Sequence, residues 1–160
     1  MTIAEQFVMY VIEKGYHVSC AESCTGGKLT GAIVDVADAS QILDASIVTY
    51  SNEAKMKYLG VKEETLNAFG AVSEETAREM AEGIARANNA QIGLSVTGTA
   101  GPGGGTAEKP VGTVCFGFSI NGKSYTERKQ FGNLGRNVVR EKSVSFSLEK
   151  ALELLKRESV

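Results

Sequence analysis

The chain has 160 residues, of which 42% are apolar and 22% are charged, the proportions of a soluble globular protein. This length predicts a single domain, residues 1–160, that buries roughly 70% of the surface of the unfolded chain. The net charge of −2 leaves the chain without the basic surface typical of nucleic-acid binding, and no apolar run approaches the roughly 18 residues of a membrane span.

The N-terminal segment, residues 1–15, has the pattern of an amphipathic helix, with Ile3, Phe7 and Tyr10 on one face and Gly15 at its end. Two acidic residues inside it argue against a signal peptide. The three cysteines fit neither a zinc spacing nor a disulfide framework. We therefore expect a cytoplasmic protein that holds no metal and no cofactor.

The next segment, with the sequence AESCTGGKLT, is expected to join a strand at residues 17–21 to a helix at residues 26–36. Serine, threonine and glycine before a helix are ordinary capping residues. The same junction also offers unpartnered backbone N–H groups and the positive end of the helix dipole to an anion. Ser23 is therefore a candidate nucleophile, and the turn after it is a candidate oxyanion site.

Other functions for this turn are disfavoured. A phosphate-binding P-loop requires glycine where Glu22 stands and serine or threonine where Leu29 stands. Cys24 is expected to pack at the helix start and not to act as a thiol nucleophile. The lone histidine, His17, begins a strand and is expected to be a surface residue, so no Ser-His-Asp triad is available.

A strand is predicted at residues 42–50, and the sequence TYSNEAK overlaps its end. Ser51 or Asn52 can cap a short helix, from whose first turns Lys55 would project. A serine without a histidine needs another base, and a lysine with a lowered pKa can supply it. The one literal S-x-x-K, Ser147 to Lys150, falls among charged residues of the last helix and is discounted.

Two more helices are expected, one at residues 62–69 and one that begins after Ser73 and ends at Asn88–Asn89. A strand at residues 92–97 then runs into a glycine-rich turn at residues 97–105. That turn is either a flexible linker or a ligand-binding turn, because α/β proteins bind ligands at the carboxyl ends of strands.

The C-terminal third predicts a hairpin of residues 111–120 and 123–131 around Asn121-Gly122, a loop at 132–135 and a final helix. This order of elements predicts a three-layer α/β/α sandwich on a mixed, mainly parallel sheet. If the preceding strands run the same way, the loops after residues 21, 50, 97 and 131 share one rim. The exposed hairpin also suggests a homodimer that covers its edge.

Five motifs resemble the CinA C-terminal domain family over residues 5–155. They are AESCTGG (21–27), VTYSNEAK (48–55), GAVS (70–73), TGTAGP (97–102) and KPVGTV (109–114). The resemblance, closest to members made of this domain alone, implies an amidase that converts nicotinamide mononucleotide to nicotinic acid mononucleotide and ammonia in the pyridine nucleotide cycle. The substrate would then be a small nucleotide.

The resemblance also implies roles for individual residues. Ser23 would be the nucleophile and Lys55 the base, Tyr50 would hold or relay the proton, and Thr97 would contribute a hydroxyl. Substrate contacts would come from the turns and from two arginines, of which either could bind the phosphate: Cys24, Thr25, Gly26, Gly27, Gly98, Gly101, Arg136 and Arg140. Alternatives are a catalytically silent module that binds a nucleotide or a partner, and a hydrolase of a different amide or phosphorylated substrate.

Overall fold

In the computed structural model, which describes residues 1–159, five strands form one sheet in the order β2-β1-β3-β4-β5. The strands are β1 (Val18–Glu22), β2 (Ile47–Val48), β3 (Ile92–Gly98), β4 (Thr113–Ile120) and β5 (Lys123–Gln130). β1 is parallel to β2 and β3, whereas β4 is antiparallel to both β3 and β5. Every strand except β4 therefore points the same way, which confirms the predicted mixed, mainly parallel sheet.

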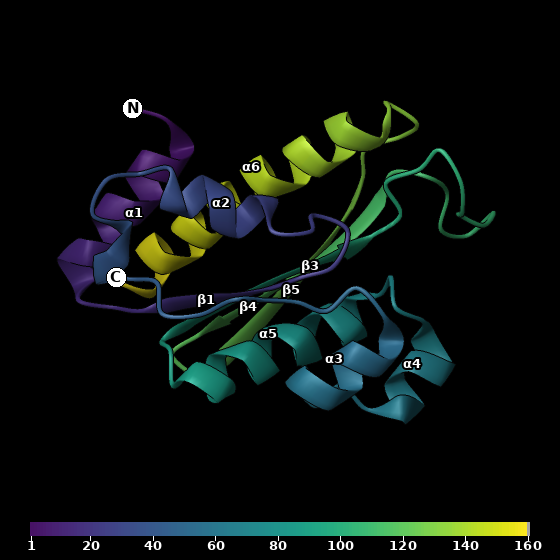
Figure 1. The fold of residues 1–160 in the computed structure, drawn as a ribbon, viewed down its shortest axis with the longest axis horizontal. Coiled ribbons are helices and arrows are strands. Elements are labelled where there is room, and N and C mark those ends of the chain that lie inside the picture. Colours follow the sequence, from purple (N-terminus) through teal and green to yellow (C-terminus); the bar gives the residue numbers. More distant parts are fainter. Residues whose placement is uncertain (160) are drawn as a thin grey trace.

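Helices cover both faces of this sheet and make three layers (Figure 1). One face carries α1 (Ile3–Lys14), α2 (Lys28–Val34) and α6 (Arg136–Glu158). The other carries α3 (Asn52–Leu59), α4 (Glu63–Phe69) and α5 (Glu74–Asn88). Within residues 1–159, no helix is both long and apolar enough to cross a membrane.

The helix ends follow the local signals in the sequence. The hydroxyls of Ser51 and Ser73 accept hydrogen bonds from backbone N–H groups in the first turns of α3 and α5, at 3.1 Å in each case. Gly15 and Asn89 end α1 and α5 in the left-handed conformation. These caps satisfy backbone groups that a helix leaves unpaired. The predicted boundaries of α1 and α5 therefore agree with the structure to within one or two residues.

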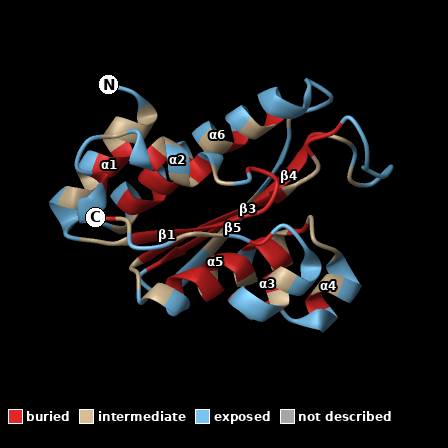
Figure 2. Ribbon diagram, viewed as in Figure 1, coloured by how far each residue is buried: buried red, intermediate tan, exposed pale blue. Residues whose placement is uncertain are grey.

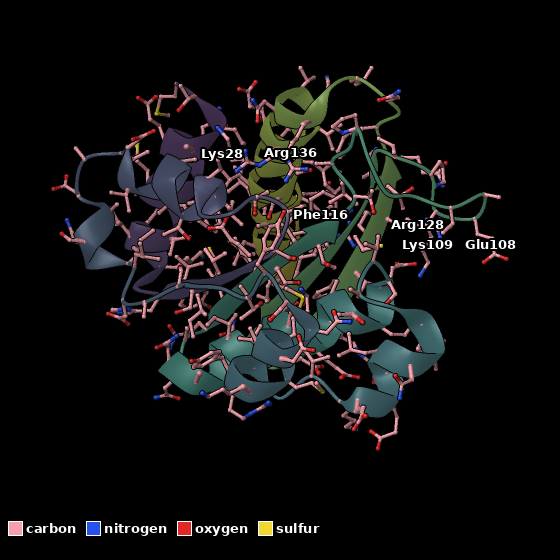
Figure 3. All side chains as sticks on the ribbon, turned by 45° about the vertical axis from the view of Figure 1, so that its right-hand side comes forward. Lys28, Glu108, Lys109, Phe116, Arg128 and Arg136 are labelled. Carbon is pink, nitrogen blue, oxygen red and sulfur yellow. The ribbon has the colours of Figure 1, made fainter. Side chains whose placement is uncertain are left out.

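The core lies where the two helical layers meet the sheet, and the central strands β1, β3 and β4 are buried except at Gly98, the last residue of β3 (Figure 2). Phe116 of β4, labelled in Figure 3, packs edge to face against Phe146 of α6 with ring centroids 4.7 Å apart. On the opposite face, a Cβ on Gly93 or Gly117 would lie about 2 Å from a backbone oxygen of α5. Glycine at these two positions lets α5 approach the sheet closely.

The predicted strand at residues 42–50 is wrong in length, because only Ile47–Val48 form β2. Side-chain and irregular contacts replace the ladder before it: the N–H of Cys20 donates to the hydroxyl of Ser46 at 3.0 Å, and the N–H of Val18 donates to the carbonyl of Ile42 at 2.8 Å. The segment stays alongside β1 without regular pairing, and it still delivers residues 49–55 to the correct end of the sheet.

The outer strand β5 is the sheet edge that the homodimer prediction invoked. Lys123, Arg128 and Lys129 on this strand are exposed. Charged residues on an edge strand discourage pairing with another sheet. A dimer over this edge stays a prediction.

Candidate active site

Four loops meet at the carboxyl ends of β1, β2, β3 and β5, as expected for strands that point the same way. There the loop after β1 carries Ser23, and α3, which follows β2, carries Lys55. The Lys55 Nζ lies 3.0 Å from the Ser23 Oγ and donates a second hydrogen bond of 2.8 Å to the carbonyl of Thr49. The structure thus brings together a hydroxyl and an amine that are 32 residues apart in the sequence.

Lys55 is buried, with only 1% of its surface exposed. No carboxylate among residues 1–159 forms an ion pair with it. Burial without an ion pair disfavours the charged ammonium, and it lowers the pKa of Lys55 below the ordinary lysine value of 10.5. A lysine with a lowered pKa is neutral more often at a given pH, and only a neutral amine can accept a proton from Ser23.

Cys24, next to the serine, has the opposite tendency. Burial raises the pKa of its thiol to about 12. The thiolate is the nucleophilic form of cysteine, so Cys24 is poorly suited to attack at neutral pH. This supports the earlier preference for Ser23.

The backbone amides of the turn do not all face the site. The N–H of Gly26 donates to the carbonyl of Ser23 at 3.1 Å, and the N–H of Gly27 donates to the Glu22 carboxylate at 3.1 Å. The expectation that Gly26 and Gly27 offer free oxyanion donors is therefore wrong, because Glu22 itself occupies the start of α2. Within residues 1–159, the N–H groups of Cys24 and Thr25 have no acceptor on another residue.

A cavity of about 260 Å³ opens onto Ser23 and Lys55. Its lining comes from the turn, the start of α3, the 71–72 loop, the glycine-rich loop and α6: Ser23, Cys24, Tyr50, Asn52, Lys55, Ala71, Val72, Thr97, Gly98, Thr99, Ala100, Gly101, Gly103 and Arg136. Most of the predicted residues are therefore gathered around one space. Thr25, Gly26, Gly27 and Arg140 are not part of its lining.

The two arginines occupy different environments. Arg136, in the first turn of α6 (Figure 3), donates to the carbonyl of Gly101 at 2.9 Å and to the hydroxyl of Tyr50 at 3.0 Å, and it lines the cavity. Arg140, one turn later, donates to the backbone carbonyls of Cys24 and Thr25 at 2.9 and 3.1 Å. Only Arg136 is thus placed where it could meet a ligand in the cavity.

Thr97 and Tyr50 are already hydrogen-bonded to other residues. The Thr97 hydroxyl donates to the carbonyl of Ala71 at 2.9 Å, which holds the 71–72 loop against the end of β3. The Tyr50 hydroxyl accepts from Arg136, and 62% of the residue is exposed. Both residues line the cavity, and neither forms a hydrogen bond to Ser23 or Lys55 among the described residues.

Six lining residues were not among the predicted site residues: Asn52, Ala71, Val72, Thr99, Ala100 and Gly103. The last three belong to the glycine-rich turn at residues 97–105, which the sequence did indicate, whereas the first three lie on other segments. Asn52 was interpreted only as a possible helix cap, and GAVS was noted only as a motif. The position of Asn52, Ala71 and Val72 beside the cavity becomes evident only in the folded chain, where the loops at the carboxyl ends of the strands meet.

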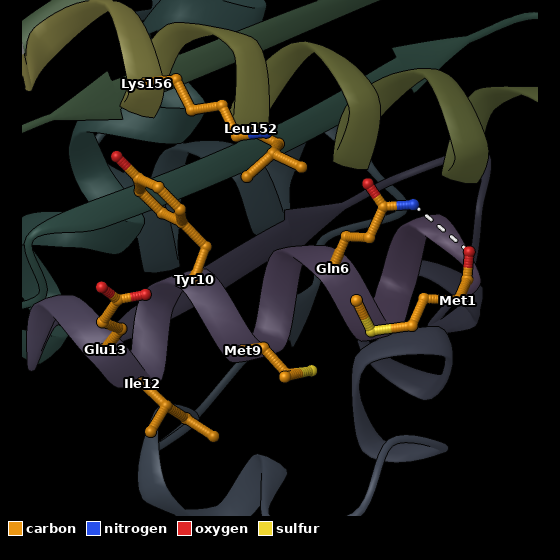
Figure 4. A pocket seen from close by; sticks show the side chains of 8 residues that line it. All are labelled: Met1, Gln6, Met9, Tyr10, Ile12, Glu13, Leu152 and Lys156. Carbon is orange, nitrogen blue, oxygen red and sulfur yellow. Dashed lines mark hydrogen bonds between the residues drawn. The ribbon is translucent and has the colours of Figure 1, made fainter.

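A larger hollow, of about 480 Å³, lies on the outer surface between α1 and α6 (Figure 4). Its lining includes Met9, Tyr10 and Leu152, and the Gln6 side chain donates to the carbonyl of Met1 there at 3.2 Å. None of the predicted site residues lines it. The smaller cavity is therefore the candidate active site, because it is lined by a serine and a buried lysine that are hydrogen-bonded to each other.

Comparison with known sequences identifies the family of the chain. The family model of the CinA C-terminal domain matches residues 1–157. The CinA-like protein of Kosmotoga olearia is 52% identical over 146 residues, which are 91% of this chain and 35% of that protein. The nicotinamide-nucleotide amidohydrolase PncC of Enterobacter agglomerans is 51% identical over 140 residues, 87% of this chain and 85% of that protein. The chain thus spans about a third of the first relative and most of the second.

Solved structures give the same result. A CinA superfamily protein from Klebsiella pneumoniae superposes with a TM-score of 0.93 at 35% identity, covering 97% of this chain and 96% of that one. The competence/damage inducible protein CihA from Agrobacterium tumefaciens has a TM-score of 0.89 at 42% identity, with 96% of both chains covered. Their fold is the one described above.

Proposed function

The chain belongs to the CinA C-terminal domain family, and from that premise we propose that it is an amidohydrolase that converts nicotinamide mononucleotide to nicotinic acid mononucleotide and ammonia, a step of NAD recycling. The observation that carries the proposal is the 3.0 Å contact between Lys55 Nζ and Ser23 Oγ in a cavity. The relative named nicotinamide-nucleotide amidohydrolase, at 51% identity, supports the choice of substrate.

The first step is acylation of Ser23. Its Oγ attacks the carboxamide carbon while its proton moves to the neutral amine of Lys55. The carbonyl of Thr49 accepts one N–H of that amine at 2.8 Å, which helps direct the lone pair of the nitrogen toward Ser23. The tetrahedral intermediate then collapses: the C–N bond breaks, and Lys55 returns the proton to the departing nitrogen as ammonia forms.

The negative charge on the carbonyl oxygen needs donors during this step. Within residues 1–159, the N–H groups of Cys24 and Thr25 have no acceptor on another residue, but only Cys24 lines the cavity, because Thr25 is fully buried. We assign the oxyanion to the amide of Cys24, in place of the helix start that Glu22 fills. Loss of such donors typically costs on the order of 100-fold in rate.

Deacylation repeats the chemistry with water. Lys55 takes a proton from a water molecule, the resulting hydroxide attacks the acyl carbon, and the Ser23 oxygen leaves and regains its proton. The acid is released, and the enzyme returns to its starting state without any additional reactant.

The nucleotide end of the substrate would lie toward the mouth of the cavity. Ser23 is 8% exposed and Lys55 1%, whereas Tyr50 is 62% exposed. The carboxamide must therefore enter first, and the ribose phosphate stays near Tyr50 and Arg136. The guanidinium of Arg136 can bind a phosphate there once it exchanges its contacts with Tyr50 and Gly101.

The proposal is tested by ammonia release from nicotinamide mononucleotide. We expect Ser23→Ala to lower kcat by about 10⁴-fold or more, because the covalent route is lost, while nucleotide binding persists. Ser147→Ala is the matched control: this buried serine also has a lysine three residues later, but Lys150 pairs with Glu153. A wild-type protein that binds the nucleotide without releasing ammonia would instead support a silent binding module.

A further inference from the structure

We propose that Glu22 and Arg140 are positioning residues that hold the nucleophile turn, residues 23–27, from its two sides. The carboxylate binds the N–H groups where α2 begins, and the guanidinium binds the carbonyl groups of the turn. The kinetic part of this inference rests on the function proposed above, and a second measurement below is independent of the substrate. Neither residue would touch the reacting atoms.

Glu22 is completely buried, and no cation among residues 1–159 forms an ion pair with its carboxylate. Its Oε1 accepts from the N–H groups of Gly27 and Leu29 at 3.1 and 2.9 Å. Its Oε2 accepts from the N–H and the hydroxyl of Thr30 at 2.9 and 2.6 Å. A buried carboxylate is costly unless its oxygens are satisfied, and here four donors from one short stretch of chain satisfy it.

Arg140 completes the arrangement from α6. Its Nε donates to the carbonyl of Cys24 at 2.9 Å and its Nη2 to the carbonyl of Thr25 at 3.1 Å. Its Nη1 donates to the Asn137 side chain at 3.1 Å. A Cβ on Gly26 would lie 3.2 Å from Nη2, so the guanidinium packs directly on the turn. All three nitrogens of Arg140 therefore have acceptors, and the residue lies outside the cavity lining.

The two side chains bind opposite polar groups of the turn and of the first residues of α2 that follow it. The Glu22 carboxylate accepts hydrogen bonds from the amides of Gly27, Leu29 and Thr30. The Arg140 guanidinium donates hydrogen bonds to the carbonyls of Cys24 and Thr25. With the peptide planes held in this way, the N–H group of Cys24, which lines the cavity, stays directed at a ligand oxygen. Misplacement of a reacting group by about 1 Å can cost on the order of 100-fold in rate, so a loosened turn should lower kcat.

The alternative to a positioning role is that Arg140 binds the substrate phosphate. Comparing a substrate that carries the phosphate with one that lacks it distinguishes the two roles. Nicotinamide mononucleotide carries the phosphate and nicotinamide riboside lacks it. We expect Arg140→Met to lower kcat by about 10-fold or more on both substrates and to leave the ratio of their KM values unchanged. Arg136→Met should instead raise KM for the mononucleotide alone.

Glu22→Gln tests the other side of the turn. The amide can keep two acceptor contacts at its oxygen, but its nitrogen cannot accept from the N–H of Thr30. We expect the same loss of kcat on both substrates. Glu5→Gln is the matched control, because the Glu5 carboxylate accepts from the N–H of Thr2 at the start of α1. It should lower thermal stability without changing kcat.

The rate at which methanesulfonyl fluoride labels Ser23, read from the mass of the intact protein, does not depend on the natural substrate. The serine oxygen forms a bond to sulfur, fluoride leaves, and the proton passes to Lys55. We expect Arg140→Met and Glu22→Gln to slow this labelling by about the factor seen in kcat. If either variant fails to fold, Arg140→Lys, which keeps the charge but not the fork of donors, should show a smaller loss in the same direction.

The outcomes are distinct. A rise in KM for the phosphorylated substrate alone in Arg140→Met, or unchanged labelling in the variants, overturns the positioning role. A wild-type protein that releases no ammonia but is labelled at Ser23 refutes the proposed function, and the labelling rates then decide the inference by themselves. A wild-type protein that is neither active nor labelled overturns both.

Discussion

Two turns at the ends of neighbouring parallel strands differ in how they are held. The turn after β1, residues 23–27, is contacted by the side chains of Glu22 and Arg140. The loop after β3 is joined to the start of β4 by backbone hydrogen bonds, with the N–H of Thr99 donating to the carbonyl of Thr113 and that of Gly112 to the carbonyl of Thr99. Arginine side chains bind single carbonyl groups of this loop, Gly101 by Arg136 and Glu108 by Arg128, and no buried carboxylate among residues 1–159 binds its amides. Its residues 102–108 are exposed.

The difference matches what each turn is proposed to do. A nucleophile and its oxyanion donors need fixed positions, because the rate depends steeply on geometry. The loop after β3, which is proposed only to contact the substrate, tolerates more movement than the turn that carries the nucleophile. Changes in the first turn should therefore act on kcat, and changes in the second should act on KM.

Among variants that keep Ser23, the largest expected effect comes from Lys55, the base that serves the first turn. Lys55→Met should lower kcat by about 10³-fold or more, because nothing then accepts the proton of Ser23. Lys57→Met, on the exposed side of the same helix, should have no effect on kcat. Steady-state ammonia release measures both, and an active Lys55→Met would show that another group removes the proton.

The pH dependence of the wild type should reveal the same lysine. The neutral amine is the active form, so kcat/KM should rise with pH through the lowered pKa of Lys55. The unfolded chain binds more protons between that lowered pKa and 10.5, so folding stability should also rise with pH in this window. In Lys55→Met this rise in the free energy of unfolding should be absent; an identical pH slope in the two proteins would contradict it.

An intermediate effect is expected from Gly26→Ala. Gly26 has a φ of +56°, and the added Cβ would press on Arg140. We expect kcat to fall about 10-fold with little change in KM, because the turn moves. Gly15→Ala is the control with similar strain, φ +68°, and no contact within 4 Å. It should lower the melting temperature but leave kcat unchanged; equal kcat losses in the two variants would point to general destabilisation.

The smallest effect should come from the second turn. Gly101 has a φ of +87°, and a Cβ there would lie 2.5 Å from a methyl group of Val111. Gly101→Ala should displace the carbonyl that accepts from Arg136 and raise KM for nicotinamide mononucleotide about threefold, with kcat nearly kept. Gly122→Ala, with a similar φ of +84° and nothing within 4 Å, is the control outside the cavity lining. A selective loss of kcat in Gly101→Ala would remove the distinction between the two turns.

Local signals predicted much of the fold. Ser51 and Ser73 cap their helices, Gly15 ends α1, and the order of elements predicted the three layers. The strand at 42–50 failed because the Ser46 hydroxyl takes the place of a ladder carbonyl. A polar side chain that bonds to a neighbouring strand leaves no periodic signal in the sequence.

The role of Glu22 was also missed. In the sequence, Glu22 is used only to exclude a P-loop, because a P-loop requires glycine at this position. An acidic residue shortly before a glycine-rich helix start is a signal for capping at a distance, and it could have indicated that the amides of Gly27 and Leu29 are already used.

The sequence by itself determined the elements, their caps and the family, because these depend on residues within a few positions of one another or on whole motifs. Only the tertiary structure decided that Lys55 meets Ser23 without an ion pair, that Arg136 and not Arg140 lines the cavity, and which amides remain free. Those outcomes depend on contacts between residues that are 32 to 116 positions apart in the sequence, and sheet order and helix packing together determine which of them meet.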